Sequence, residues 1–238
     1  MKYILLLSSF FSISYGQITQ VGNIDYTEFF GVHEKKYYSM SFSEFFSIYE
    51  QNTINEDGIE IINGFKEPQI KRKYFTNLKA KEILFIEGIA YIEILAKDTL
   101  NIAWELKEDQ KRIGEFNCYK ATTNFKKNNY TAWFTTEIPF SFGPWKFNGL
   151  PGIILEISDE TNFHQIIATR IRLEKSQVSL SKKIEEFNKS KPKTMREYKM
   201  LRKREDEDIY NLLISKAGRE TYLKVSTDYT GFLREPFD

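Results

Sequence analysis

Cysteine and histidine are nearly absent from this chain. One cysteine, Cys118, and two histidines, His33 and His164, occur among its 238 residues. A single cysteine cannot form an internal disulfide. Catalysis by a serine or cysteine nucleophile usually needs a histidine base, so only two positions can supply one. The scarcity therefore narrows the enzyme classes open to this protein.

An excess of either charge is also lacking, and so are long apolar runs. Lysine and arginine together number 34 and the acidic residues 33, a balance that argues against a general nucleic-acid binder. Beyond the N-terminus, no run approaches the about 20 apolar residues that a transmembrane helix needs. Phosphate-binding glycine loops and zinc-helix motifs are missing too. We expect no cofactor, no metal site, no nucleic-acid partner and no transmembrane segment in the mature chain.

The first sixteen residues have the pattern of a secretory signal peptide. Lys2 is a short basic region, Ile4 to Ile13 is an apolar core, and Gly16 is a small residue suited to cleavage before Gln17. We therefore expect a signal peptide over 1–16 and one domain over 17–238. The predicted location is the periplasm or the outer membrane surface, or outside the cell.

Most of the remaining chain is patterned for strands. The expected strands are Ile24 to Phe30, Tyr37 to Phe42, Ile59 to Ile62, Lys73 to Phe75, Ile83 to Ile86, Ala90 to Ala96, Ile102 to Leu106, Tyr130 to Ile138, Ile153 to Ser158 and His164 to Leu173. Gly88 and Lys97 to Thr99 are expected hairpin turns. A short strand or tail is expected over Tyr222 to Asp238. Antiparallel pairing through short turns is the simplest arrangement.

The character of the sequence changes after Ser181, where Lys182 to Asn188 and Thr194 to Ser215 favour helix. Thr194 and Glu197 have the spacing of a capping box. The charged run from Arg202 to Asp208 is expected to be an exposed middle part of a helix that packs at its ends. The fold class that we predict is α+β: a mostly antiparallel, curved, half-barrel-like sheet with a C-terminal helix. A β-sandwich is the alternative.

The most tightly specified stretch is Pro139 to Gly152, here called the signature loop. It holds three of the six prolines, three glycines and several aromatic residues, so few backbone conformations are open to it. Its rings could fill the core, or they could form the rim of an apolar binding site, where a stiff loop binds at low entropic cost. The candidate rim or binding residues are Trp133, Pro139, Gly143, Pro144, Trp145, Phe147, Gly149, Leu150, Pro151 and Gly152.

The same stretch carries a family resemblance. Gly149 to Ile154 reads Gly-Leu-Pro-Gly-Ile-Ile, and Ala132-Trp133-Phe134 and Cys118-Tyr119-Lys120-Ala121 precede it. These motifs resemble the GLPGLI family of exported bacterial envelope proteins, whose biochemical role is unassigned. The resemblance covers about Trp104 to Asp159 and implies a cell-envelope location and a sheet fold. Asp98-Thr99-Leu100 also resembles the O-glycosylation site of exported proteins in the bacterial group where this family is common.

Two function classes follow. The first is a non-catalytic envelope protein that binds an apolar ligand, such as a lipid or peptide, or an outer-membrane partner. The second is a hydrolase that uses Cys118, paired with His164, or the carboxylates Glu156 and Asp159. Because free cysteines are usually buried, we expect Cys118 to be structural and assign no catalytic residue.

Overall fold

The computed structural model describes residues 19–31, 34–52, 59–62, 65–68, 71–89, 92–176 and 191–216. Its strands are β1 (Thr19–Phe30), β2 (Glu34–Phe42), β3 (Phe46–Gln51), β4 (Ile59–Ile62), β5 (Phe65–Pro68), β6 (Lys73–Asn77), β7 (Glu82–Ile89), β8 (Ile92–Thr99), β9 (Glu105–Ile113), β10 (Phe116–Phe125), β11 (Asn128–Thr135), β12 (Ile153–Asp159), β13 (His164–Ser176) and β14 (Lys193–Thr194). One helix, α2 (Met195–Lys216), follows β14. The expected helix over 182–188, the expected tail over 222–238 and the signal segment lie outside the described residues.

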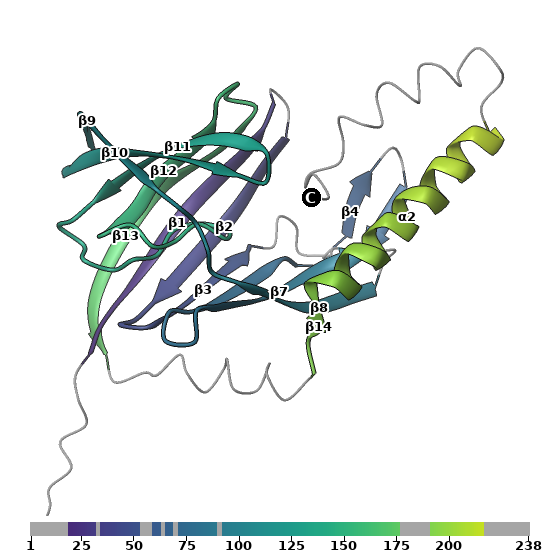
Figure 1. Ribbon diagram of the computed structural model, residues 1–238, viewed down its shortest axis with the longest axis horizontal. Coiled ribbons are helices and arrows are strands. Elements are labelled where there is room, and N and C mark those ends of the chain that lie inside the picture. The colour runs from purple at the N-terminus through teal and green to yellow at the C-terminus, as the bar shows by residue number, and fades with distance from the viewer. Residues whose placement is uncertain are drawn as a thin grey trace, which may run out of the picture.

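Twelve of these strands form one curved, unclosed sheet (Figure 1). Its order is β14-β8-β7-β6-β3-β2-β1-β13-β12-β11-β10-β9, and every pair is antiparallel except β14 with β8. Two meanders therefore meet where the long strands β1 and β13 pair. Strands β4 and β5 form a separate hairpin between β3 and β6. The half-barrel prediction is confirmed, and the described strands do not form the alternative two-sheet sandwich.

The connection from β8 to β9 runs from the strand next to the short edge strand β14 to the opposite edge of the sheet (Figure 1). Leu100, Ile102 and Trp104 of this segment pack against the buried core. The indole Nε1 of Trp104 donates to the carbonyl oxygen of Asn148 in the signature loop at 2.8 Å. The open side of the curl is thus lined by two segments that are bonded to each other.

The core lies on the concave face because inward side chains alternate along each strand. Ile24 and Tyr26 of β1 pair with Met40 and Tyr38 of β2, and all four are almost fully buried. Phe85 of β7 continues this layer toward the edge of the sheet. A continuous interior of large aromatic and aliphatic side chains results.

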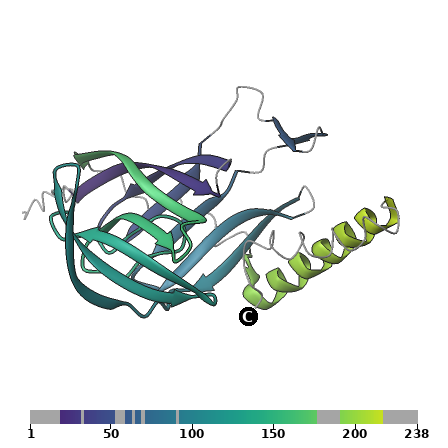
Figure 2. The ribbon, with the colours of Figure 1, turned by 90° about the horizontal axis from the view of Figure 1, so that it is seen from above.

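Helix α2 lies beside β7 and β8 (Figure 2). The Thr194 hydroxyl accepts from the Glu197 backbone N–H at 3.3 Å, and the Glu197 carboxylate accepts from the Thr194 backbone N–H at 2.8 Å, which confirms the capping box. Buried Tyr198 places its ring edge-on against Phe85. Arg202 donates to the carbonyl of Gly88 at 3.3 Å, so the charged run is only partly exposed.

Several boundaries differ from the sequence-based expectation. Gly88 lies inside β7 and Lys97 to Thr99 inside β8, so neither is a turn. The expected strand over Ile102 to Leu106 is wrong for its first three residues, because β9 begins at Glu105. Charged β9 lacks an apolar alternation, and its strand form depends on pairing with β10 at an edge where charges discourage aggregation. Strand β3 was not expected, because its burial pattern does not follow a simple alternation: Ser47, Ile48 and Tyr49 are buried in succession.

Candidate functional site

The signature loop is held by its own backbone. Phe140 N–H donates to Ile138 O, Phe142 N–H to Phe140 O, and Gly149 N–H to Ser141 O, all at 2.8 to 3.0 Å. Ile154 N–H then bonds to Phe142 O at 2.9 Å, which ties the loop to the start of β12. These bonds satisfy groups that would otherwise be buried without partners. The loop is therefore a fixed structural segment.

Two glycines of this loop lie where no side chain fits. A Cβ on Gly152 would stand 2.0 Å from the carbonyl oxygen of Thr135, and one on Gly143 would stand 2.9 Å from that of Phe147. Real Cβ atoms do not approach backbone atoms so closely, and backbone cannot move aside as a flexible side chain does. The two glycines allow the loop to lie directly on the strands around it.

The loop crosses the concave interior. Phe142 is fully buried and its ring centroid lies 6.4 Å from that of Phe42 on β2. Buried Lys146 places its ammonium group 4.1 Å from the ring centroid of Phe85 on β7 and 3.8 Å from the carboxylate of Asp98 on β8. The loop thus contacts strands as far apart in the sheet as β2 and β8, so it fills the concave interior.

The predicted rim residues divide by burial. Gly143, Pro144, Phe147, Leu150 and Gly152 are buried, Trp133 and Trp145 are half-buried, and Pro139, Gly149 and Pro151 are exposed. On β11, Trp133 alternates with the buried residues Ala132 and Phe134, so it lies on the opposite face of the sheet. There its ring lies 4.4 Å from the ammonium of Lys111, which is paired with Glu156. The ten candidates therefore do not share one surface.

Trp145 is the candidate with an unusual backbone. Its φ is +55°, a conformation in which a bulky residue is an outlier. Its ring is edge-on to Phe125 and Phe147, with centroids 5.7 and 5.3 Å away, and 5.8 Å from the imidazole of His164. Strained conformations of this kind persist where neighbouring groups fix them, often at functional sites.

Beneath Trp145 lies a buried pair that the sequence analysis missed. His164 Nε2 and Glu28 Oε1 are 2.9 Å apart, and both residues are less than a tenth exposed. Phe30 stacks on the imidazole with centroids 4.4 Å apart. The signal was present, because Glu28 occupies the inward position in the alternation Ile24, Tyr26, Glu28.

Glu28 is charged despite its burial. Burial alone would raise its pKa, but the hydrogen bond and charge of His164, helped by the charge of Arg72, lower the pKa below its usual range. Its second oxygen, Oε2, is buried and has no hydrogen-bond partner among the described residues, and neither has the hydroxyl of Tyr49. Unpaired buried groups of this kind cost free energy, of the order of 1–3 kcal/mol each.

A cluster of tyrosines continues this polar end of the interior. Tyr49 stacks on Tyr38 with centroids 4.6 Å apart and lies 6.1 Å from Tyr74. The Tyr74 hydroxyl donates to Glu87 Oε1 at 2.6 Å, and Tyr198 of α2 donates to Glu87 Oε2. Burial raises the pKa of Tyr49 and Tyr74 well above the usual value. Both phenols therefore stay neutral, and the Tyr74 phenol donates a hydrogen bond.

The candidate nucleophile is not positioned for catalysis. Cys118 is fully buried on β10, and burial raises its thiol pKa to about 11, so the reactive thiolate is scarce at neutral pH. Strands β11 and β12 lie between β10 and β13, which puts Cys118 and His164 about 14 Å apart along the sheet at ~4.8 Å per strand. The structure does not bring this predicted pair together.

The candidate carboxylate pair is engaged elsewhere. Both oxygens of Glu156 accept from Lys111 at 2.8 Å. Asp159 accepts from the backbone N–H groups of Thr161, Phe163 and His164 at 2.9 to 3.2 Å, so it fixes the β12–β13 turn. Within the described ranges, no group of three or more potential metal ligands occurs. No described helix is long and apolar enough to cross a membrane.

Comparison with known families gives one short match. A family model described as a protein of unknown function (Porph_ging) matches residues 123–156, which run from the end of β10 through the signature loop into β12. A comparison with curated proteins finds no match. The family match therefore marks the signature loop and says nothing of activity.

Solved structures share the fold. Two crystal forms of PNGF-II, in space groups C2 and P21, each have a TM-score of 0.56 and 15% identity and cover 79% of this chain. The chain spans about a third of the length of those proteins, 33% and 34%. A LolA superfamily protein, NE2245 from Nitrosomonas europaea, has 7% identity and a TM-score of 0.27 over 67% of this chain and 88% of its own, too low to support any conclusion.

Proposed function

We propose that this chain is an exported cell-envelope protein of the GLPGLI type that acts by binding an apolar ligand at the surface around Trp145. The observation that carries the proposal is the left-handed backbone of this half-exposed tryptophan. A conformation of this type costs of order 1–3 kcal/mol, and folding alone does not require a tryptophan there. Presentation of the exposed part of its ring to a ligand accounts for a tryptophan at this position.

The surroundings of Trp145 fit an apolar ligand with an anionic head. Half-buried Phe125 and Phe30 extend the aromatic surface on either side of the Trp145–His164 contact. The ammonium groups of Lys126 and Lys146 lie 5.8 and 5.9 Å from the Trp145 ring. Rigid rings bind an acyl chain or apolar side chain with little loss of entropy. Lys126 favours a carboxylate at its end, whereas Lys146 is buried and lies close to Asp98.

Other members of the predicted set have supporting roles in this proposal. Phe147 packs edge-on against the tryptophan, Leu150 belongs to the buried core, and the glycines and prolines shape the chain around them. The hydrolase alternative receives no support from the described residues, because Cys118, Glu156 and Asp159 each have a structural environment. An outer-membrane partner that inserts an apolar side chain would use the same surface.

The proposal is tested by native mass spectrometry of protein purified from the envelope of its host, together with titration of the purified protein by sodium laurate. We expect a retained or added acyl ligand, and Trp145→Ala should lower laurate affinity about tenfold, as expected when a good aromatic contact is removed. Tyr119→Ala, which removes a partly exposed ring on another strand, is the matched control. A protein that carries no ligand and does not bind laurate would disprove the binding role.

The export part has its own measurement. The proposed signal peptide over 1–16 gives a mature protein that begins at Gln17 and forms one domain over 17–238. Intact-mass analysis of the protein from its host would show this N-terminus. The same spectrum tests the predicted sugar on Thr99, an exposed residue at the end of β8. A mass that fits the full chain would refute export by cleavage.

A further inference from the structure

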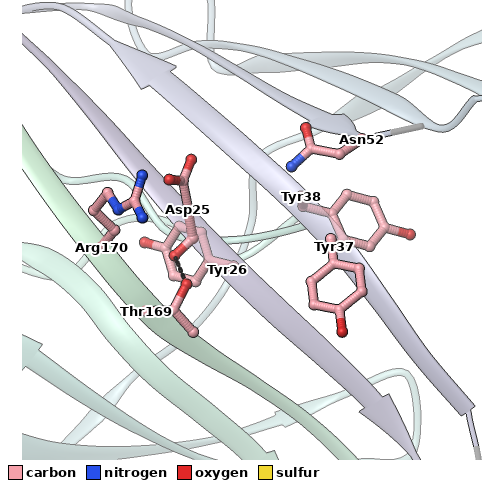
Figure 3. A pocket seen from close by; sticks show the side chains of 7 residues that line it. All are labelled: Asp25, Tyr26, Tyr37, Tyr38, Asn52, Thr169 and Arg170. Atoms are coloured by element: carbon pink, nitrogen blue, oxygen red, sulfur yellow. Dashed lines mark hydrogen bonds between the residues drawn. The ribbon is translucent and has the colours of Figure 1, made fainter. Parts of the chain in front are cut away.

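A pocket lies on the convex face of the sheet, opposite the core, where β1, β2 and β13 run side by side (Figure 3). It has a volume of about 320 Å³, and its lining includes Asp25, Tyr37, Asn52, Thr169 and Arg170. Asp25 alternates with the inward residues Ile24 and Tyr26, so its side chain belongs to the outer face. The volume is near the lower end of the range for small-molecule sites.

A β-bulge shapes this pocket. Asp25 pairs with Arg170, whereas Tyr26 pairs with Ala168, so Thr169 is left without a partner in the register. The Thr169 hydroxyl donates to the carbonyl of Asp25 at 3.1 Å and fixes the bulge. Bulges redirect side chains and are often found next to binding sites. Here the extra residue places Arg170 and Asp25 at the same opening (Figure 3).

The hydrogen bonds in the floor of the pocket leave acceptor capacity open. The Ser39 hydroxyl lies 2.9 Å from Asp25 Oδ1 and 3.1 Å from Asn52 Oδ1. A hydroxyl has a single proton, so it can donate to only one of these oxygens. The other oxygen remains able to accept a hydrogen bond from a ligand. Asn52 itself is fixed, because its backbone N–H bonds to Tyr37 O at 2.8 Å.

Charges in the pocket nearly cancel. Arg172 donates to both oxygens of Asp25 at 3.1 and 3.2 Å, which neutralises that carboxylate. Arg170 is exposed, and no ion pair to it occurs among the described residues. Arginine offers planar, forked donors, and Tyr37, which is 47% exposed, lies on the other side of the pocket (Figure 3). The pocket thus combines an exposed ring with planar donors and acceptors.

We infer that this convex-face pocket binds a saccharide unit. A sugar ring has a C–H face that packs on an aromatic ring, as Tyr37 offers. Its vicinal hydroxyls both donate and accept, which matches the carboxylate of Asp25, the amide of Asn52 and the guanidinium of Arg170. A strongly anionic ligand would find only one uncompensated positive charge. The site is independent of the surface around Trp145, which lies on the other side of the sheet.

The test uses the full mature chain with D-glucose, D-galactose, D-mannose and N-acetylglucosamine, each titrated separately and followed by ¹H–¹⁵N NMR. We expect at least one sugar to shift the Asn52 side-chain amide and the backbone amides of Tyr37 and Arg170 in a saturable way. Tyr37→Ala should lower the affinity for that sugar about tenfold, as loss of an aromatic contact predicts. Tyr37→Phe should retain most of the affinity.

Two further measurements make the result decisive. Arg196→Ala changes an exposed arginine on α2 and should leave sugar binding unchanged, while Arg170→Ala should reduce it. Sodium acetate and sodium sulfate are titrated in parallel. If only these anions shift the NMR signals of the pocket residues, or if no sugar shifts these signals, the saccharide inference is wrong. Shifts confined to residues elsewhere in the chain would also overturn it.

Discussion

The two ends of the concave interior are built from different chemistry. At one end the signature loop packs Phe142 near Phe42 and Phe147 among further aromatic rings, with glycines pressed against backbone. At the other end, tyrosines surround the charged groups Glu28, Arg72 and Glu87. Both ends belong to the same sheet and the same core. The loop end depends on close packing, whereas the tyrosine end depends on hydrogen bonds and charge.

Because of this difference, the stability of the two ends is expected to respond to different changes. Close-packed regions respond to changes of side-chain volume. Regions with buried charge respond to protonation and to the loss of a single partner. The tyrosine end is also where α2 docks, through Tyr198 and Arg202. Attachment of the helix is therefore expected to depend on single hydrogen bonds.

The largest effect is expected at Gly152 of the loop end. Gly152→Ala places a Cβ within 2.0 Å of the Thr135 carbonyl oxygen, and overpacking against backbone should lower the free energy of unfolding by about 3 kcal/mol or more. Urea denaturation gives the value. Gly114→Ala is the control, because its Cβ meets open space and only its positive φ is strained, at a cost of ~1 kcal/mol. Equal losses in the two variants would contradict close packing at Gly152.

A smaller loss is expected where the helix meets the tyrosine end. Tyr198→Phe keeps the ring against Phe85 but removes the hydroxyl that donates to Glu87. A hydrogen bond to a charged group contributes about 1.5–3 kcal/mol. Hydrogen exchange should show faster exchange in α2 and little change in the signature loop. Uniform acceleration over the whole sheet would mean that the helix is not a separate unit.

The stability that the tyrosine end contributes should also depend on pH. The pKa of Glu28 is lowered in the folded state, so its contribution is present above the unfolded pKa and is lost as the pH falls through the folded pKa. Glu28→Gln should reduce the loss of stability between the usual glutamate pKa and more acid conditions. Urea titrations from pH 7 downward measure it. If the wild type and the variant lose stability in parallel, Glu28 is not the group responsible.

The smallest effect is expected at Cys118. Its thiol pKa is raised to about 11 and its side chain is fully buried, so iodoacetamide at pH 7.5 should modify it only after denaturation. Cys118→Ala should cost about 1 kcal/mol, the loss of one small buried group. Mass spectrometry of native and denatured samples compares the rates. Rapid labelling of the folded protein would reopen a catalytic role for this thiol.

Much of this architecture could be predicted from local pattern. Alternation along Ile24 to Phe30 and along Tyr37 to Phe42 predicted β1 and β2, and the spacing of Thr194 and Glu197 predicted the start of α2. Strand ends were less predictable, because pairing with a neighbour extended β7 past Gly88 and β8 through Thr99. Charged β9 was predicted only at its first two residues, since the strand form of the rest comes from its partner.

The sequence identified the signature loop as a candidate site, but it did not identify the groups that surround the loop. Prolines and glycines limit the backbone locally. The sequence motif that contains them therefore identified the signature loop as conformationally restricted. The sequence could not pair Glu28 with His164, which are 136 positions apart, or place Trp133 and Trp145 on different surfaces.

The sequence by itself determined that this chain makes a curved antiparallel sheet with a stiff loop and a capped helix, because periodicity, turn residues and caps act within a few positions. Only the tertiary structure decided which of the predicted side chains are buried, which charges meet inside the curl, and that Asp25, Tyr37 and Arg170 share a pocket. Those outcomes depend on strand order and register, which are set by contacts between distant segments.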